Sequence, residues 1–274
     1  MNIIKKDITV KGFTAKLTGY ILDNFNEIDI NRKRSTILIC PGGAYAWTSP
    51  REAEPIAMRF ASHGFQCFVL DYSCSPTGAE YPVALSQALL SIKTIREHAD
   101  EWHVDPEKIA ICGFSAGGHL AANVSCDYNN SEALALIGAK TDEGKPNASV
   151  LCYPVISSGE YAHKDSIKNL LGSKFSPEME EYVSLEKRVT ENNPPTFLWH
   201  TFEDGCVPVQ NSLLFASALK EKNVPFELHI FPSGGHGLSL ADPETNREWG
   251  KHLLEEIRQW PELASVFLKN LFGE

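Results

Sequence analysis

Short apolar runs separated by helix-like stretches constrain the fold of this chain more than any other feature of its sequence. Most of the runs are continuous rather than alternating, which is typical of strands buried on both faces of a parallel sheet. The runs lie at residues 36–40, 67–71, 109–112, 149–153, 196–199 and 226–231. Between them, apolar residues recur at three- and four-residue steps, as at 85–95, 212–219 and 249–260. The alternation predicts an α/β fold, with a mostly parallel central sheet and helices on both of its faces.

Two segments depart from this alternation. Residues 8–30 alternate more regularly and carry no helix signal, so we expect a pair of antiparallel edge strands there. The segment 157–193 is polar, partly helical at 165–171 and 177–188, and too long for an ordinary connection. We interpret it as a small cap inserted above the sheet, and a surface insertion without a role at the site is the alternative. Residues 1–274 are otherwise expected to form a single domain.

Charge and composition disfavour several classes of protein. The formal net charge is −10 at pH 7, whereas nucleic-acid and anionic-membrane partners require a basic surface. The sequence has no apolar run of the roughly 18 residues that a membrane span needs, and its first residues lack the apolar stretch of a secretory signal. We therefore expect a cytoplasmic protein with no nucleic-acid or membrane partner.

The cysteines are expected to be packing residues. The chain has 7 of them and no Cys-x-x-Cys pair. Cys40, Cys67, Cys112 and Cys152 lie in or beside apolar runs, which favours buried thiols. Because a zinc site needs clustered Cys and His at ligand spacing, no metal site is predicted.

A candidate nucleophile lies at a predicted strand-to-helix turn. The pentapeptide Gly-Phe-Ser-Ala-Gly at 113–117 follows the run 109–112 and opens a helical stretch over 116–126. A serine on such a turn lifts its hydroxyl clear of the sheet, and the flanking glycines leave room for the turn. The five residues alone are a weak signal, and a plain glycine-rich turn is the alternative. The strand before them and the helix after them favour Ser115 as the nucleophile.

A second glycine-rich loop follows the earlier strand 36–40. Its sequence, Cys-Pro-Gly-Gly-Ala-Tyr, occupies residues 40–45. Backbone N–H groups in that place can point at the atom that the nucleophile attacks. We predict an oxyanion hole formed by the N–H of Ala116 and by that of Gly43 or Ala44. A tight turn that only ends the strand is the alternative.

His236 is the predicted general base among the 9 histidines. It lies in a Gly-Gly-His-Gly loop after the run 226–231, where an imidazole can reach over the sheet edge to Ser115. The other histidines that we considered are expected to be packed or surface residues. They are His119, His200, His229 and His252.

Asp204 is the predicted acid of the site. It follows the run 196–199, precedes His236 in the chain and lies just before a helix that Pro208 can start. Its carboxylate would fix the tautomer of the imidazole and stabilise the imidazolium. Glu203 is the rival acid, and an ordinary helix-capping role for Asp204 is the other alternative.

The chain order Ser115, Asp204, His236, with each residue in a loop after a strand, resembles that of the α/β-hydrolases. More narrowly, Asp-Pro-Glu-Lys-Ile-Ala at 105–110, followed by Gly-Phe-Ser-Ala-Gly-Gly-His-Leu-Ala at 113–121, is similar to acetyl esterases and xylan-deacetylase-like proteins. That group also carries a Pro-Gly-Gly-x-Tyr loop, seen here at 41–45. Its acid lies in a His-Thr/Gly-x-x-Asp-x-x-Val-Pro stretch, seen here at 200–208. The resemblance implies the α/β-hydrolase fold over most of the chain.

Two departures narrow the resemblance. Hormone-sensitive-lipase-like proteins have His-Gly-Gly-Gly, where this chain has Pro41 in place of the His and Ala44 in place of the third Gly. Backbone N–H donors survive both changes, so the oxyanion loop is retained while that branch is disfavoured. Secreted xylan deacetylases carry signal peptides, and the first residues of this sequence do not look like one. This difference favours small acetylated sugars over polymeric xylan as the expected substrates. No pair of carboxylates stands out for glycosidic cleavage.

The candidate residues predict a serine hydrolase that works through an acyl-enzyme. The resemblance implies a carboxylesterase for small-acyl esters, with acetyl esters of sugars as candidate substrates. No metal or organic cofactor is expected. The alternatives are a kynurenine-formamidase-like amide hydrolase and a non-catalytic α/β-hydrolase binding module. Tyr45, Trp47 and Tyr72 are candidate substrate-binding residues around a small acyl pocket, or else core aromatics. The sequence leaves open whether the protein forms a homo-oligomer.

Overall fold

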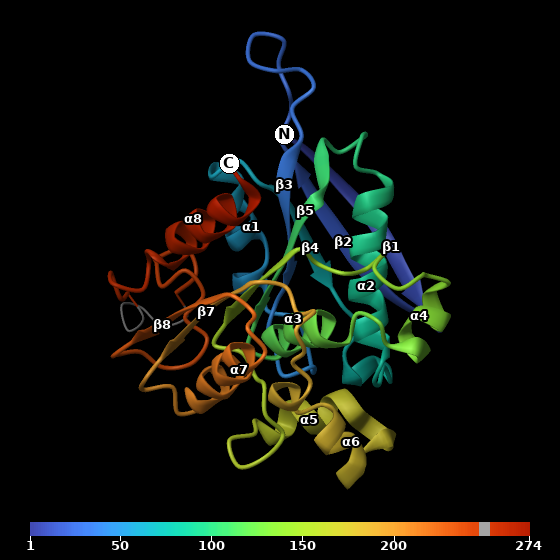
Figure 1. Cartoon of the computed structure of the whole chain (residues 1–274), viewed down its shortest axis with the longest axis vertical. Helices are drawn as coiled ribbons and strands as arrows, with labels where there is room; N and C mark the ends of the chain where they lie inside the picture. Colours follow the sequence, from blue (N-terminus) through green and yellow to red (C-terminus); the bar gives the residue numbers. More distant parts are fainter. Residues whose placement is uncertain (247–252) are drawn as a thin grey trace.

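An eight-stranded sheet forms the centre of the molecule, with its strands in the order β1-β2-β4-β3-β5-β6-β7-β8 (Figure 1). The structure is a computed structural model that describes residues 1–246 and 253–274. Strands β3 to β8 run parallel, whereas β1 and β2 are antiparallel to their neighbours. The strands are β1 Asn2–Val10, β2 Phe13–Ile21, β3 Arg34–Cys40, β4 Gln66–Asp71, β5 Val104–Phe114, β6 Ala148–Cys152, β7 Thr196–Thr201 and β8 Phe226–Phe231.

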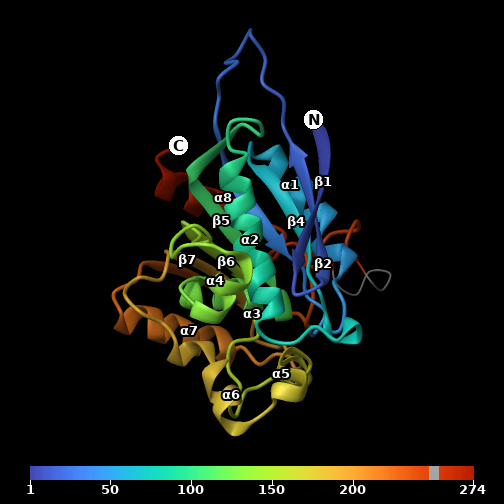
Figure 2. The ribbon, with the colours of Figure 1, turned by 90° about the vertical axis from the view of Figure 1, so that its right-hand side faces the viewer.

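Helices cover both faces of the sheet (Figures 1 and 2). Helices α1 and α8 pack on one face of the sheet, and α2, α3 and α7 pack on the other. The helices of each face cover a separate apolar core cluster. The predicted α/β fold with a mostly parallel sheet is confirmed. The helices are α1 Glu54–Ser62, α2 Val83–Glu97, α3 Ala116–Asp127, α4 Ser131–Ile137, α5 Lys164–Leu171, α6 Pro177–Tyr182, α7 Gln210–Glu221 and α8 Trp260–Phe272, with short 3₁₀ turns η1 Pro50–Glu52, η2 Ser75–Thr77, η3 Gly172–Lys174 and η4 Leu185–Lys187.

The predicted antiparallel pair exists, but it lies earlier in the chain than expected. It spans β1 and β2, joined at Lys11 and Gly12, whose φ angles of 50° and 82° suit a two-residue hairpin turn. Residues 22–33 form no strand and project from the body as a loop (Figure 1). Phe25 and Ile28 in this loop are 60% and 74% exposed. Their spacing imitates a strand pattern without the burial that a strand face requires.

The predicted helix over 249–260 is wrong in its described part. Trp249 and His252 lie outside the described residues, and 253–259 forms turns rather than a helix. The Leu254 carbonyl accepts N–H bonds from Ile257 and Arg258, so a single turn forms and does not continue. Helix α8 begins only at Trp260, followed by a proline that suits the first turn of a helix.

Residues 157–193, which we call the cap segment, lie at the end of the molecule where α5 and α6 are seen in Figures 1 and 2. Helix α5 matches the prediction closely. The predicted helix 177–188 ends at Tyr182 and is followed by the separate turn η4, so it is shorter than expected. The Ser176 side chain accepts the Met179 N–H and fixes the start of α6.

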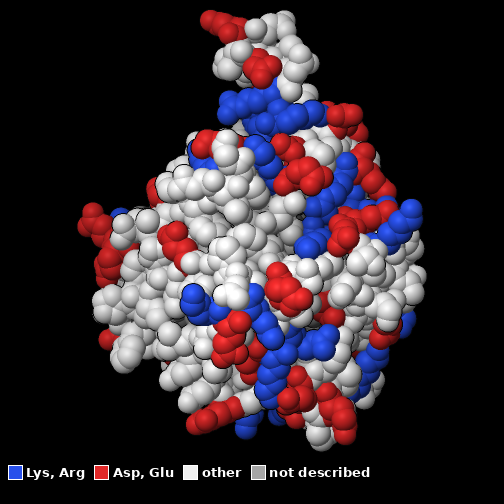
Figure 3. Space-filling view, in the orientation of Figure 1, with Lys and Arg blue, Asp and Glu red and all other residues white. Residues whose placement is uncertain are grey.

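Three predictions from composition concern the cysteines, membrane-spanning segments and surface charge. Cys40, Cys67, Cys112 and Cys152 are buried free thiols, as predicted. No helix in the described ranges is long and apolar enough to cross a membrane. Figure 3 shows Lys and Arg side chains interspersed with Asp and Glu over the face of the molecule seen in Figure 1.

Candidate active site

Ser115 occupies the sharp turn between β5 and α3. Its φ of 53° and ψ of −117° are unusual for a residue with a side chain and mark a strained turn. A Cβ atom on Gly113 would lie 2.1 Å from the Gly117 carbonyl oxygen, and one on Gly117 would lie 2.1 Å from the Cys40 carbonyl oxygen. Only glycine therefore fits on either side of this serine, and the turn packs directly against the end of β3.

The three predicted residues Ser115, His236 and Asp204 meet at the carboxyl ends of the strands. His236 Nδ1 lies 2.7 Å from Asp204 Oδ2, and its Nε2 lies 2.7 Å from Ser115 Oγ. Because a carboxylate only accepts, Nδ1 donates to it and Nε2 is left to accept the serine proton. The arrangement has the connectivity of a nucleophile, a base and an orienting acid. We call these residues the candidate triad.

Donors surround the Asp204 carboxylate, which is only 5% exposed. The N–H groups of Cys206 and Val207 each donate to Oδ1 at 2.9 Å. Burial by itself raises the pKa of Asp204, but hydrogen bonds from His200 and His236 outweigh it and hold the pKa well below its usual range. The group is therefore an anion that can stabilise an imidazolium at His236.

His200 is a neighbour of Asp204 that our sequence analysis treated as merely structural. Its Nε2 lies 2.9 Å from the Val207 carbonyl oxygen and 3.3 Å from Asp204 Oδ2. Both are acceptors, so Nε2 carries a proton, and Nδ1 pairs with Ser212 Oγ at 2.8 Å. In the sequence, this contact could have been indicated by the four-residue spacing of His200 and Asp204 at the end of a predicted strand. Glu203, the rival acid, instead accepts the Gly234 N–H at 3.1 Å.

Residues 41–47, which we call the oxyanion loop, lie directly against the candidate nucleophile. A Cβ atom on Gly42 would be 3.0 Å from Ser115 Cβ and 2.7 Å from Glu52 Oε2. The Gly42 N–H donates to Glu52 Oε2 at 2.8 Å. This amide is already satisfied, which leaves the N–H groups of Gly43 and Ala44 as the candidate donors of the loop.

The peptide between Gly43 and Ala44 has a defined direction. Its carbonyl accepts N–H bonds from Ala46 at 2.9 Å and from Trp47 at 3.2 Å. In a trans peptide the N–H points opposite to the carbonyl, so the Ala44 N–H points away from these two donors. Ala116, at the first position of α3, contributes an amide at the positive end of that helix.

The three candidate substrate-binding aromatics have different surroundings. Tyr45 and Tyr72 are each 2% exposed, whereas Trp47 is 48% exposed. The Tyr72 hydroxyl donates to the Pro41 carbonyl at 2.8 Å, and the Tyr45 hydroxyl lies 2.9 Å from His119 Nδ1. Both hydroxyls thus bond to other groups of the protein, Tyr45 from within the oxyanion loop and Tyr72 from outside it.

A buried pair, Glu52 and Tyr153, joins the oxyanion loop to the loop that carries His236. The Tyr153 hydroxyl donates to Glu52 Oε1 at 2.7 Å and accepts the Ser239 N–H at 2.9 Å. Its ring lies edge-on to the His236 imidazole, with ring centres 5.2 Å apart. Nothing in the local sequence indicated this pair, because its members are far apart in the chain.

A cleft of about 1160 Å³ opens beside the oxyanion loop. Its lining combines hydroxyl and carboxylate side chains, such as Thr48 and Asp71, with apolar groups of Tyr20 and Met58. Pro41, at the start of the oxyanion loop, and Ser49, two residues beyond its end, form part of the wall of the cleft. Ser115, His236 and Asp204 do not line this cleft, so it lies beside the candidate triad and not over it.

Comparisons with known proteins place this site in a family context. Endo-1,4-beta-xylanase B of Butyrivibrio fibrisolvens is 37% identical over 89% of this chain, and the acetylxylan esterase of Xylanibacter ruminicola is 29% identical over 84% of it. The chain spans only 38% and 46% of these two proteins. The crystal structure of an acetyl ester-xyloside bifunctional hydrolase from Caldicellulosiruptor lactoaceticus is 37% identical, with a TM-score of 0.79, over 95% of this chain and 89% of that one.

A family model also matches most of the chain. The BD-FAE model covers residues 22–219, which include the oxyanion loop, Ser115 and Asp204. The structural relatives share the fold described above, and the family is one of α/β-hydrolases. The α/β-hydrolase resemblance seen in the sequence is therefore confirmed, and this chain belongs to the BD-FAE family.

Proposed function

We propose that this protein is a serine carboxylesterase that hydrolyses small-acyl esters, with acetylated sugars as its substrate class. The observation that carries the proposal is the hydrogen-bonded series Ser115–His236–Asp204, with both connecting distances at 2.7 Å. The acetylxylan esterase and the acetyl ester-xyloside hydrolase among the relatives support the substrate class. Glycosidic cleavage is not proposed, since no pair of carboxylates in the sequence stands out for that chemistry.

In the proposed reaction, Ser115 Oγ attacks the acyl carbon while His236 Nε2 accepts its proton. The carbonyl oxygen becomes an oxyanion, which accepts N–H bonds from Ala116 and from Ala44 or Gly43. His236 then protonates the departing alcohol, and water releases the acyl group from Ser115 by the same steps. Asp204 stays ionised throughout and stabilises the imidazolium.

A confined site supports the small acyl group. Ser115 is 9% exposed and the His236 side chain 19% exposed, so the reacting atoms are largely covered by protein. Tyr153 closes one side of the His236 ring. The cleft beside the oxyanion loop is lined by none of the candidate triad, so it does not indicate the acyl or the alcohol group. The low exposure of the reacting groups favours acetyl over long acyl chains, and the sugar alcohol is proposed from the two relatives named above.

The test is turnover of p-nitrophenyl acetate and octanoate, followed by acetylated xylose, by the wild type and by Ser115→Ala. We expect acetate to be the better chromogenic ester and the variant to lose several orders of magnitude in kcat. Equal activity of the two proteins would exclude Ser115 as the nucleophile. Octanoate turning over faster than acetate would refute the small acyl pocket. Inactivity toward esters with activity toward N-formylkynurenine would favour the formamidase alternative.

A further inference from the structure

The oxyanion loop has a strained backbone that requires support. Its three successive residues Gly43, Ala44 and Tyr45 have φ angles of 136°, 55° and 56°. Residues with a Cβ atom rarely adopt positive φ, and such conformations persist only where the surrounding structure holds them. The contacts of these three residues therefore decide whether their N–H groups keep their directions.

One contact comes from the cap segment. Asn169, on α5, donates its side-chain N–H to the Ala44 carbonyl at 2.8 Å. At the next residue of the loop, the Tyr45 carbonyl accepts the Ser75 N–H at 2.8 Å. Asn169 is 125 residues away from Ala44 in the chain. It thus fixes the Ala44–Tyr45 peptide, which follows the candidate oxyanion donor, the Ala44 N–H.

A second route runs through His119, one turn after the candidate nucleophile on α3. The ring is fully buried, and its Nε2 donates to the Val183 carbonyl of the cap segment at 2.9 Å. Its Nδ1 accepts the Tyr45 hydroxyl at 2.9 Å. Burial lowers the pKa of His119 to about 4, so the ring stays neutral and keeps one donor and one acceptor. The imidazole therefore joins the cap segment to the oxyanion loop.

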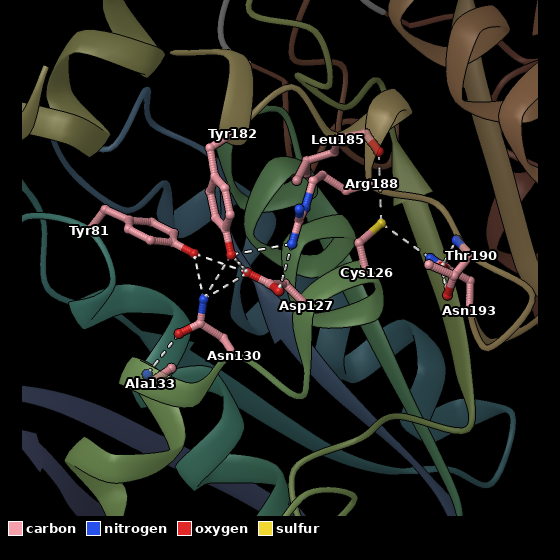
Figure 4. A network of polar contacts seen from close by, with 10 residues as sticks. All are labelled: Tyr81, Cys126, Asp127, Asn130, Ala133, Tyr182, Leu185, Arg188, Thr190 and Asn193. Carbon is pink, nitrogen blue, oxygen red and sulfur yellow. Dashed lines mark hydrogen bonds and ion pairs between the residues drawn. The ribbon is translucent and has the colours of Figure 1, made fainter. Parts of the chain in front are cut away.

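The cap segment is itself fixed to the far end of α3 (Figure 4). Asp127 is 4% exposed and accepts from the Tyr182 hydroxyl at 2.8 Å and from Arg188 Nη2 at 3.2 Å. The Arg188 guanidinium also lies over the Tyr182 ring, 4.2 Å from its centre. Asn130 donates to the same carboxylate at 2.9 Å. Both ends of α3, the helix that follows Ser115, are thus bonded to the cap segment.

We propose that the cap segment holds the oxyanion loop in its catalytic conformation, with Asn169 and His119 as positioning residues. The inference rests on the proposed esterase function of Ser115. It makes the cap segment a fixed part of the catalytic site rather than a lid that opens at each turnover. Neither positioning residue touches the substrate; each acts on the direction of the Ala44 and Gly43 N–H groups.

The test compares Asn169→Ala with Lys168→Ala, a change at an exposed residue of the same helix. Two quantities are measured: kcat and KM for p-nitrophenyl acetate, and backbone deuterium exchange over residues 42–47. For Asn169→Ala we expect kcat to fall about 10-fold, with KM within about twofold, because the lost support acts on the transition state. Exchange should also become faster. Lys168→Ala should match the wild type, and the same result for Asn169→Ala would overturn the inference.

Two further variants guard against a loss of folding. Asn169→Asp keeps the size of the side chain but places an acceptor against the Ala44 carbonyl, so it should lower kcat at least as much. Tyr45→Phe removes only the hydroxyl that bonds His119 and should lower kcat in the same way. Wild-type values of kcat and exchange in both variants would refute the positioning role.

The failure of this inference can be told apart from the failure of the proposed function. A fluorophosphonate should label Ser115 in the wild type, as read by mass spectrometry. If the wild type neither hydrolyses esters nor reacts with the fluorophosphonate, the esterase proposal fails, while the exchange comparison still decides whether the cap segment holds the loop. If the wild type does both and Asn169→Ala does both equally fast, only the positioning inference fails.

Discussion

His200 Nε2 lies 3.3 Å from Asp204 Oδ2, the same oxygen that accepts from His236 Nδ1 at 2.7 Å. The candidate acid is therefore held between two histidines. One of them faces Ser115, and the other is fully buried behind the carboxylate. This second histidine limits the rotation of the carboxylate and favours its ionised form.

Replacing His200 should weaken catalysis without abolishing it. In His200→Gln, Asp204 keeps its two N–H bonds from Cys206 and Val207 and its bond to His236. Loss of one of several donors to a charged group costs about 1–2 kcal/mol, so we expect kcat for acetyl esters to fall about 10-fold. Glu203→Gln, beside the acid, is the matched control and should stay within about twofold. A larger loss in the control would favour Glu203 as the acid.

Gly42 should not tolerate even one methyl group. A Cβ atom there would lie 2.7 Å from Glu52 Oε2 and 3.0 Å from Ser115 Cβ. The loop must then move away from the nucleophile, and misplacement by about 1 Å can cost a factor of 100 in rate. We expect Gly42→Ala to lower kcat by about 100-fold or more in a steady-state assay. Gly205→Ala is the control, since a Cβ atom there meets nothing within 4 Å; equal rates in the two variants would contradict the close approach.

Tyr153→Phe should lower both activity and stability. The variant keeps the ring beside His236 but removes the hydroxyl that joins Glu52 to the Ser239 N–H. Leaving a buried carboxylate oxygen and an amide without this partner costs about 2–3 kcal/mol. We expect the free energy of unfolding in urea to fall by about that amount and kcat to fall about 10-fold. Tyr128→Phe, just after the C-terminal end of α3, is the control and should change neither the free energy of unfolding nor kcat by much. Equal values of both quantities in the two variants would exclude a linking role for Tyr153.

The sheet and the candidate triad were predictable because their signals are local. Continuous apolar runs mark strands that are buried on both faces, and each run lies within a few residues of its strand. Ser115, Asp204 and His236 each follow such a run, and strand ends of a parallel sheet meet at one edge. Glycines around Ser115 further indicate the turn, since packing forbids a Cβ atom there.

The supporting contacts were not predictable, because they join residues distant in the chain. Glu52 and Tyr153 are 101 residues apart, and Asn169 and Ala44 are 125 apart. A single glutamate or asparagine in a polar stretch carries no sign of its partner. The hairpin and the last helix were misplaced for a related reason: apolar spacing in the loop 22–33 and in the turns 253–259 imitates regular structure, and only burial and hydrogen bonding separate the two.

His119 should make the stability of the protein depend on pH. Burial lowers its pKa in the folded protein to about 4, against a usual value of 6.5, although its bond to Val183 acts in the opposite direction. Between these two pH values the unfolded chain binds a proton that the folded protein does not, so stability falls as the pH is lowered from about 6.5 towards 4. The loss attributable to this group is of the order of 3 kcal/mol. His119→Gln keeps a donor and an acceptor but cannot titrate, so its unfolding free energy should fall less over that range. Urea unfolding of both proteins at pH 7.5, 6 and 4.5 measures the difference, in which the titration of all other groups cancels. Parallel pH profiles for the two proteins would mean that the fold does not lower the pKa of His119, so that the ring would take up a proton near pH 6.5 and lose the Tyr45 hydroxyl bond below it.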